Sequence, residues 1–433
     1  MSDVTTIERL ARSDLTRLQV ERLCALLERA ARVPLHRERL AAAKVGPGDI
    51  RSLDDLRRLP FTTKADFRDT YPFGLLAVPM DQIVRIHASS GTTGKPAVVA
   101  YTRGDLDVWT EVMSRTRRAG GVRPGDVVQN AYGYGLFTGG LGFHYGAEAV
   151  GAAVIPVSGG FTERQLVAFQ DLGSTVLCCT PSYALHLAEA IEEAGVAMDA
   201  LRLRVGFFGA EPWTEAMRTA IEKRLRLMAL NIYGLSEVTG PGVAVECPER
   251  QGMHLAEDHF LPEIVDPKTL EPVPPGTTGE LVLTTLSKEG MPLLRYRTRD
   301  LTTLDPAPCR CGRTLVRLGR IMARSDDMLI IRGVNVYPSQ VEHALLQVPE
   351  LAPHYVLVVR REHALDTLEV QVEGQPGAVP AGEAAAGALA ARVRRRLAEA
   401  LGVSVEVGIV APKTIERSVG KAKRVLDLRG QSG

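Results

Sequence analysis

The chain has 433 residues, of which 45% are hydrophobic and 24% charged, and its formal net charge is +1 at pH 7. At about 150 residues per domain this length predicts two or three domains. The near-neutral charge lacks the basic excess that nucleic acid or an anionic membrane would require, so neither is expected as a partner. The first residues show no signal-peptide pattern and no apolar run reaches the roughly 20 residues of a membrane span, so we expect a cytoplasmic enzyme.

The chain opens with a helical pattern. Between Thr5 and Ala43, leucine and valine recur at intervals of three and four residues among arginine and glutamate. This spacing predicts helical structure that serves packing rather than chemistry.

A run of small and hydroxylated residues follows between two strand-like segments, Ile83–Val84 and Val98–Val99. Glycine lets backbone N–H groups approach an anion, while hydroxyl groups and a lysine add donors and positive charge, so the run predicts a loop that binds a phosphate chain. The Walker A spacing is absent, and the alternative is a polar surface hairpin. The predicted phosphate-binding residues are Ser89, Ser90, Gly91, Thr92, Thr93, Gly94 and Lys95.

Aromatic residues alternate with glycines between Asn130 and Tyr145. Glycine removes bulk beside the rings, so Tyr132, Tyr134 and Phe137 are predicted to line a flat hydrophobic slot for an aromatic or acyl group. The alternative is a glycine-rich segment for helix packing with aromatic core residues.

Helix and strand patterns alternate through this part of the chain, which is typical of an α/β fold. Two predicted strands end in glycine followed by an acid, in Gly209-Ala210-Glu211 and in Gly234-Leu235-Ser236-Glu237. Ligands bind beyond the carboxyl ends of parallel strands, so these loops and the phosphate loop are predicted to converge on one nucleotide. Tyr233 would stack on the base, and Glu237 would carry Mg²⁺, which prefers carboxylate oxygens.

Further along, Asp300 follows a cluster of arginines. Its carboxylate is predicted to accept hydrogen bonds from a ribose diol, and the alternative is a structural ion pair with an arginine. Beyond Asp326 the pattern changes to a small α+β unit with an alanine-rich helix near 382–401. We therefore predict two domains, residues 1–325 and 326–433. The basic run near the end, Arg417–Arg424, is predicted to form a mobile loop, and the alternative is a solvated tail.

Six cysteines are too sparse for a disulfide scaffold. Cys247, His254, Cys309 and Cys311 supply a Cys₃His set that suits tetrahedral structural zinc, and the alternative is free buried cysteines. Cys24, Cys178 and Cys179 are expected in the core.

Together these motifs resemble the acyl-adenylate-forming superfamily, and specifically its phenylacetate-CoA ligase family. The resemblance rests on ordered runs across most of the chain: 89–96, 130–137, 208–215, 233–237, 296–300, 325–328, 332–336 and 420–421. It implies a large N-terminal domain of α/β sheets with a small β-barrel, and a small mobile α+β C-terminal domain that rotates about Asp326.

The resemblance also implies a reaction in two halves. A carboxylate attacks the α-phosphate of MgATP to give acyl-AMP and pyrophosphate, and the thiolate of coenzyme A then displaces AMP. Lys421, Thr92 and Glu237 would be catalytic. The adenine would contact Gly209, Ala210, Glu211, Tyr233, Gly234 and Ser236, the ribose would contact Asp300 and Arg324, and Gly333 would line the coenzyme A tunnel.

Three functions remain open from the sequence. The leading one is an aryl or arylacetic acid CoA ligase, with Gly209 and the aromatic slot holding a small-molecule aryl carboxylic acid. A second is an adenylating enzyme that passes the acyl group to a carrier protein or an amine. The third is a non-catalytic nucleotide-binding regulator. Relatives suggest a homodimer.

Overall fold

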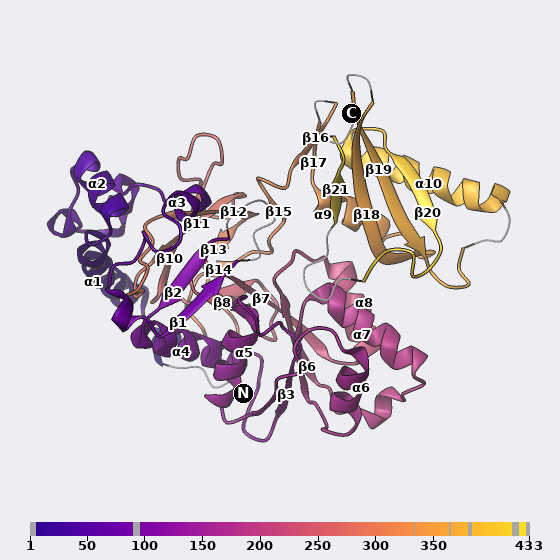
Figure 1. Cartoon of the computed structure of the whole chain (residues 1–433), viewed down its shortest axis with the longest axis horizontal. Helices are drawn as coiled ribbons and strands as arrows, with labels where there is room; N and C mark the ends of the chain where they lie inside the picture. Colours follow the sequence, from indigo (N-terminus) through magenta and orange to yellow (C-terminus); the bar gives the residue numbers. More distant parts are fainter. Residues whose placement is uncertain are drawn as a thin grey trace. The chain divides into compact units, whose positions relative to one another are not determined.

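The structure is a computed structural model that describes residues 6–89, 96–332, 334–362, 365–379, 383–417 and 424–429. The chain divides into two compact units (Figure 1). The first comprises Met1–Cys179, Ala197–Ala210 and Met228–Arg320, and the second comprises Thr180–Val196, Glu211–Leu227 and Ile321–Gly433. The second unit therefore contains two segments from the middle of the chain in addition to its C-terminal part. The predicted domain boundary at Asp326 stays a prediction.

Two helices form the start of the chain. α1 (Arg12–Ala30) and α2 (Pro34–Ala43) are separated at residues 31–33, so the helical pattern predicted from Thr5 to Ala43 is confirmed over most of its length and is broken before Pro34. Proline lacks a backbone N–H and disfavours helical dihedrals in the residue before it, and Val33 is extended. Pro34 instead occupies the first turn of α2, where its missing N–H costs nothing.

A nine-stranded sheet dominates the first unit, in the order β13-β14-β9-β8-β7-β6-β5-β3-β4. Strands β4, β3, β5, β6 and β7 are parallel, and the rest of the sheet is antiparallel. The predicted α/β architecture is confirmed. The strands are β3 (Val127–Asn130), β4 (Ala153–Ile155), β5 (Val176–Cys179), β6 (Val205–Gly209), β7 (Met228–Leu235), β8 (Gly240–Glu246), β9 (Met253–Leu255), β13 (Leu304–Asp305) and β14 (Arg317–Leu318).

Smaller elements complete the first unit. β10, β11 and β12 form an antiparallel sheet, and β1 pairs antiparallel with β2. These elements are α3 (Lys64–Asp69), β1 (Arg85–Ala88), β2 (Val98–Tyr101), α4 (Arg103–Ala119), α5 (Gly139–Glu148), α6 (Thr162–Gln170), β10 (Phe260–Val265), β11 (Gly279–Thr285) and β12 (Tyr296–Thr302).

The glycines of the aromatic segment serve helix packing as well. From Gly139 onward the segment is α5, and a Cβ on Gly142 would lie 2.6 Å from the Trp109 ring on α4. A Cβ on Gly146 would lie 2.4 Å from Met113, also on α4. The second half of the predicted slot is thus a close contact between two helices, which is the alternative interpretation of that pattern.

The second unit contains a four-stranded sheet in the order β20-β19-β18-β21. Alternate residues of β18 and β19, among them Leu357 and Val370, form a core with Val393 and Leu397 of α10, which runs along the sheet in Figure 1. The predicted α+β character of this region is confirmed. Its elements are α7 (Pro181–Glu193), α8 (Glu215–Leu225), β15 (Ala323–Arg324), β16 (Leu329–Ile331), β17 (Val334–Val336), α9 (Pro338–Leu345), β18 (Leu351–Glu362), β19 (Leu365–Gly374), α10 (Glu383–Leu401), β20 (Glu406–Val410) and β21 (Val425–Asp427).

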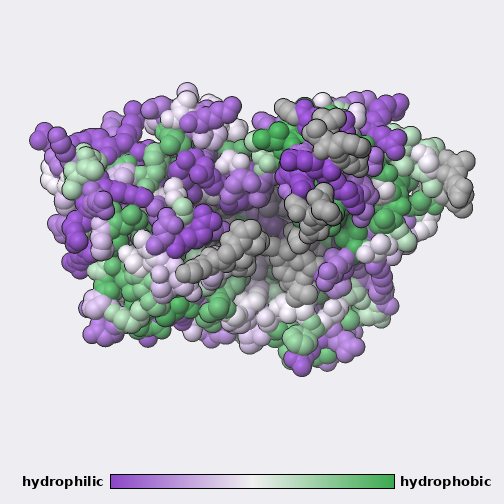
Figure 2. Space-filling view, turned by 45° about the horizontal axis from the view of Figure 1, so that its top comes forward, coloured by the Kyte–Doolittle hydropathy of each residue, from purple (hydrophilic) through white to green (hydrophobic). Residues whose placement is uncertain are grey.

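The surface mixes hydrophilic and hydrophobic residues on the face seen in Figure 2. Among the helices of the described residues, none combines the length and the apolar character that crossing a bilayer requires.

Candidate active site

The candidate site lies in the first unit, at the carboxyl ends of its parallel strands. The loops that follow β3, β6 and β7 leave the same edge of the sheet because neighbouring parallel strands end side by side. The backbone N–H of Gly209 donates to the Tyr132 hydroxyl at 3.0 Å, and the Tyr132 ring stacks on Phe143 at 4.6 Å. Two predicted substrate-binding residues from different loops are thereby in contact.

The end of β6 requires unusual backbone. A Cβ on Gly209 would lie 2.2 Å from the carbonyl oxygen of Ile232, so only glycine fits there. Ala210 has a φ of +68°, a left-handed conformation that costs a non-glycine residue on the order of 1–3 kcal/mol. Such strain gathers at functional sites, and no sequence pattern indicated it at Ala210.

The Tyr134 hydroxyl belongs to a polar chain. It accepts from the Asn130 amide at 2.7 Å and lies 3.1 Å from Nδ1 of His144, whose Nε2 lies 3.1 Å from Glu148. Burial raises the pKa of Tyr134 to about 12, so the hydroxyl stays protonated at neutral pH. Sequence reasoning missed His144, which forms this contact only because α5 follows the glycine-rich turn.

Phe137, the third aromatic residue of the predicted slot, is half-buried. A Cβ on Gly139 would lie 2.6 Å from its ring and 3.3 Å from Cβ of Tyr132. Glycine at position 139 therefore leaves room for the Phe137 ring and for Tyr132.

Two predicted nucleotide-binding residues are hydrogen-bonded to each other. The Tyr233 hydroxyl, at the end of β7, donates to Oδ2 of Asp300 on β12 at 2.6 Å. Tyr233 is 8% exposed and Asp300 7%. A bond this short to a carboxylate is charge-assisted and fixes both side chains. The sequence predicted both residues but not that they touch, because they lie on different sheets.

Glu237 lies in the four-residue turn 236–239 that joins β7 to β8. It is 7% exposed, and within the described residues its carboxylate has no hydrogen-bond partner. Ser236 Oγ lies 3.0 Å from Thr138 Oγ1, and the Tyr101 hydroxyl donates to the carbonyl of Thr239 at 2.9 Å. A buried carboxylate on a braced turn is suited to a cation.

A buried lysine lies under the same turn. The Lys288 ammonium donates to the carbonyl oxygens of Glu237 at 3.1 Å and Val238 at 2.7 Å. Burial lowers the pKa of Lys288 to about 8. The sequence analysis did not identify this residue.

A strand lies on each side of the predicted phosphate loop: β1 begins just after the predicted Ile83–Val84 segment, and β2 includes the predicted Val98–Val99. β1 and β2 pair antiparallel, and at the base of the loop Ser89 N–H donates to the Ala97 carbonyl while Ala97 N–H donates to Ser89 Oγ. The other predicted phosphate-binding residues, the coenzyme A residue and the catalytic lysine lie outside the described residues: Ser90, Gly91, Thr92, Thr93, Gly94, Lys95, Gly333 and Lys421.

The remaining predicted residues lie in the second unit. Arg324, predicted to contact ribose, forms a two-pronged ion pair with Asp326, the predicted hinge, at 2.9 and 2.8 Å. Both side chains are partly exposed, so this pair contributes little to stability.

Glu211, predicted to contact the adenine, accepts a hydrogen bond at 2.8 Å from the backbone N–H of Ser182, at the start of α7.

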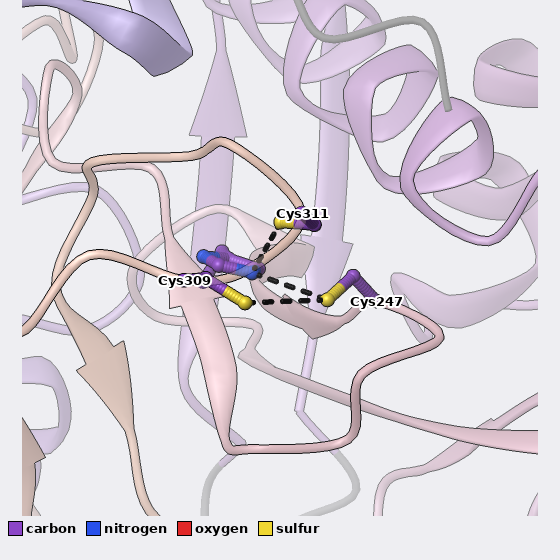
Figure 3. A group of neighbouring side chains, drawn as sticks. Cys247, Cys309 and Cys311 are labelled. Atoms are coloured by element: carbon purple, nitrogen blue, oxygen red, sulfur yellow. Dashed lines mark hydrogen bonds between the residues drawn. The ribbon is translucent and has the colours of Figure 1, made fainter. Parts of the chain in front are cut away.

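The four predicted metal ligands form a cluster at the antiparallel end of the large sheet (Figure 3). Cys247 follows β8, His254 lies on β9, and Cys309 and Cys311 share one loop before β14. The Sγ atoms of Cys247 and Cys309 are 3.8 Å apart, and Nε2 of His254 lies 3.4 Å from Sγ of both Cys247 and Cys311. All four ligand atoms lie within 4.8 Å of one another.

These distances match the edges of a zinc tetrahedron. With Zn–S near 2.3 Å and Zn–N near 2.05 Å, tetrahedral angles place two sulfurs about 3.8 Å apart and a sulfur and a nitrogen about 3.6 Å apart. A disulfide would need a separation of about 2.05 Å, and all the cysteines are free. The pKa of Cys311 is lowered, first by its contact with the Cys247 thiol and then by His254 and Arg313, which favours the thiolate that a metal binds.

Comparison with known proteins identifies the family. Residues 20–287 match the AMP-binding enzyme family, and residues 333–429 match the AMP-binding enzyme C-terminal domain. Phenylacetate-coenzyme A ligase of Thermus thermophilus is 53% identical over 98% of both chains. The protein of the same name from Escherichia coli is 51% identical over 99% of this chain and 98% of its own. The chain belongs to the phenylacetate-CoA ligase family.

A solved relative supports the fold of this family member. The crystal structure of 2-hydroxyisobutyryl-CoA ligase in the postadenylation state, in complex with 2-HIB-AMP, superimposes with a TM-score of 0.92 at 29% identity. It covers 98% of this chain and 92% of its own. The resemblance stated from the motifs is therefore correct, and so is the fold class that it implied.

Proposed function

We propose that this phenylacetate-CoA ligase family member joins phenylacetate or a related aryl acid to coenzyme A, at the expense of ATP. It is an AMP-forming acid–thiol ligase that works in two half-reactions. In the first, the acid attacks the α-phosphate of ATP, giving the acyl-adenylate and pyrophosphate; in the second, the coenzyme A thiolate displaces AMP. The observation that carries the proposal is near-full-length identity above 50% with phenylacetate-coenzyme A ligases.

The described residues fit this chemistry. The contact between Tyr132 and Gly209, with Phe137 nearby, suits a flat aromatic ring at the carboxyl edge of the sheet. Asp300, held by Tyr233, is the acceptor for the ribose hydroxyls, and Gly209 and Ala210 provide backbone for the adenine. We assign the phosphates to residues 89–95, and the bridge between carboxylate and α-phosphate to Lys421.

Magnesium is the cation of this reaction, and Glu237 fits it, as a buried carboxylate without a hydrogen-bond partner among the described residues. When bound, Mg²⁺ neutralises phosphate charge and stabilises the charge that develops during displacement. The turn 236–239 holds the Glu237 carboxylate at the edge of the sheet.

We further propose that Cys247, His254, Cys309 and Cys311 hold a structural zinc ion. The ligand distances and the burial of three of the four residues support this assignment. The ion would fasten the loop after β8 to the loop before β14, at the end of the large sheet opposite β4. Its four protein ligands leave no position for substrate, so its role would be stability rather than catalysis.

The cellular context is proposed from the chemistry. ATP and coenzyme A are intracellular metabolites, so the enzyme would act in the cytoplasm, and a homodimer remains the expected assembly. Transfer of the acyl group to a carrier protein or an amine is the second candidate.

A panel of aryl and arylacetic acids tests the proposal. Pyrophosphate release with MgATP is measured for each acid, with and without coenzyme A, and acyl-CoA is followed by chromatography. Release that requires a particular acid, with acyl-CoA formed when coenzyme A is added, is the expected result. Acid-dependent release without acyl-CoA would move the acceptor elsewhere, and no release with any acid would contradict ligase activity.

A further inference from the structure

Lys288 is a buried lysine of the first unit. It lies in the loop between β11 and β12, is 6% exposed, and forms no ion pair within the described part of the chain. Its ammonium faces the Tyr101 ring, 5.1 Å from the ring centroid. Burying an ammonium group is costly unless polar groups replace its water, so the position of this lysine requires an explanation.

The turn 236–239 supplies those polar groups. The N–H groups of Val238 and Thr239 both donate to the carbonyl of Leu235, so the turn closes as one helical turn does. Side chains from elsewhere in the chain bind the carbonyl oxygens of this turn, among them the Tyr101 hydroxyl on Thr239. A cation is favourable at such carbonyl oxygens, as it is at a helix C-terminus. Lys288 binds two of them, those of Glu237 and Val238.

The loop that carries Lys288 is itself fixed. Arg29 of α1 donates to the carbonyls of Leu286 at 2.7 Å and Lys288 at 3.1 Å. Asp105 of α4 accepts from the N–H groups of Glu289 at 2.7 Å and Gly290 at 2.9 Å. Arg29 and Asp105 therefore fix the backbone of the loop on both sides of Lys288. The hydrogen bonds of the Lys288 ammonium connect this fixed loop to the turn 236–239.

We propose that Lys288 is a positioning residue of the active site, acting through the backbone of Glu237 to hold the Glu237 carboxylate where it meets the cation of the nucleotide. This inference rests on the proposed role of Glu237. Adenylation requires that cation, whereas transfer of the acyl group from a preformed acyl-adenylate to coenzyme A consumes no ATP. Loss of Lys288 should therefore impair the first half-reaction selectively.

The test compares Lys288→Met, which keeps the length of the side chain and removes its donors, with Lys268→Met on an exposed lysine after β10. Adenylation is measured as pyrophosphate release, and transfer as phenylacetyl-CoA formation from synthetic phenylacetyl-AMP. We expect Lys288→Met to slow adenylation about tenfold to a hundredfold and to leave transfer within about threefold. Lys268→Met should change neither. Equal loss in both halves would overturn the proposal.

A binding measurement separates positioning from general damage. Electron paramagnetic resonance of Mn²⁺ in the presence of ATP measures the affinity of the protein for the cation without turnover. This affinity should fall about tenfold in Lys288→Met. In a Glu237→Gln background, Lys288→Met should cause less than about threefold further loss, because both changes remove the same interaction. Unchanged Mn²⁺ affinity, or full additivity, would contradict the proposal.

Three further observations keep the outcomes distinct. If Lys288→Met does not fold, Lys288→Gln takes its place: its side chain is uncharged and one bond shorter, so its amide does not reproduce both contacts to the turn, and its Mn²⁺ affinity must still fall below that of the wild type. If Glu237→Gln adenylates normally, the proposed role of Glu237 fails, and the assignment of Lys288 fails with it. If wild-type protein releases no pyrophosphate with any acid, the ligase proposal fails instead.

Discussion

Acid should weaken the fold through one buried histidine that supports the active-site loop. His36 of α2 is 1% exposed, and its Nε2–H donates to the carbonyl of Pro292 at 3.0 Å. Pro292 lies in the same loop as Lys288, between β11 and β12. Burial lowers the pKa of His36 to about 4, from 6.5 in an unfolded chain. Between pH 6.5 and 4 the unfolded chain therefore binds a proton that the folded chain does not, and the free energy of unfolding falls as the pH falls.

The size of this effect follows from the pKa difference. About 2.5 pKa units correspond to roughly 3 kcal/mol of stability, present above pH 6.5 and lost progressively as the pH falls to 4. His36→Gln keeps an N–H donor for Pro292 and does not titrate. Urea unfolding of both proteins at several pH values between 7.5 and 4 gives the difference in free energy of unfolding at each pH. We expect this difference to shift by about 3 kcal/mol in favour of the variant as the pH falls.

The control is Arg37→Gln on the exposed side of the same helix, because an arginine does not titrate in this range. Its difference from the wild type should not change with pH. If the difference in free energy of unfolding between wild type and His36→Gln is also independent of pH, the reasoning is refuted. His36 would then have the same pKa in the folded and the unfolded chain.

Three further predictions concern the site. Tyr233→Phe removes the donor to Asp300, so the KM for ATP should rise about tenfold while the KM for the acid stays constant, as measured by steady-state pyrophosphate release; an unchanged KM for ATP would contradict the ribose assignment. Elemental analysis of protein purified without chelators should give one zinc per chain, and Cys311→Ser should lose the metal and melt at a lower temperature in calorimetry; wild type without zinc would remove that site. Lys421→Ala should suppress adenylation but largely spare acyl transfer from preformed acyl-AMP, and equal loss in both halves would reject its proposed role.

Features that depend on local pattern could be predicted from the sequence. Strand-like segments that end in glycine followed by an acid identified β6 and β7, and the set of three cysteines and one histidine identified a cluster of candidate metal ligands. The two strands on either side of the predicted phosphate loop followed from the same kind of pattern.

Features that depend on long-range packing could not be predicted. Lys288 and Glu237 are 51 residues apart, and nothing in a sequence pairs a lysine with backbone carbonyls rather than with an acid. The positive φ of Ala210 is imposed by the tertiary structure against the preference of alanine. The break before Pro34 was a local signal that the leucine periodicity concealed.

The most direct test of the central claim is a single-turnover experiment with excess enzyme, phenylacetate and MgATP, followed by rapid quenching and mass spectrometry. Without coenzyme A, we expect phenylacetyl-AMP to accumulate on the enzyme with one pyrophosphate released per adenylate. Addition of coenzyme A should then convert it to phenylacetyl-CoA and AMP. Phenylacetyl-CoA formed with ADP and phosphate, or without any adenylate, would contradict the account.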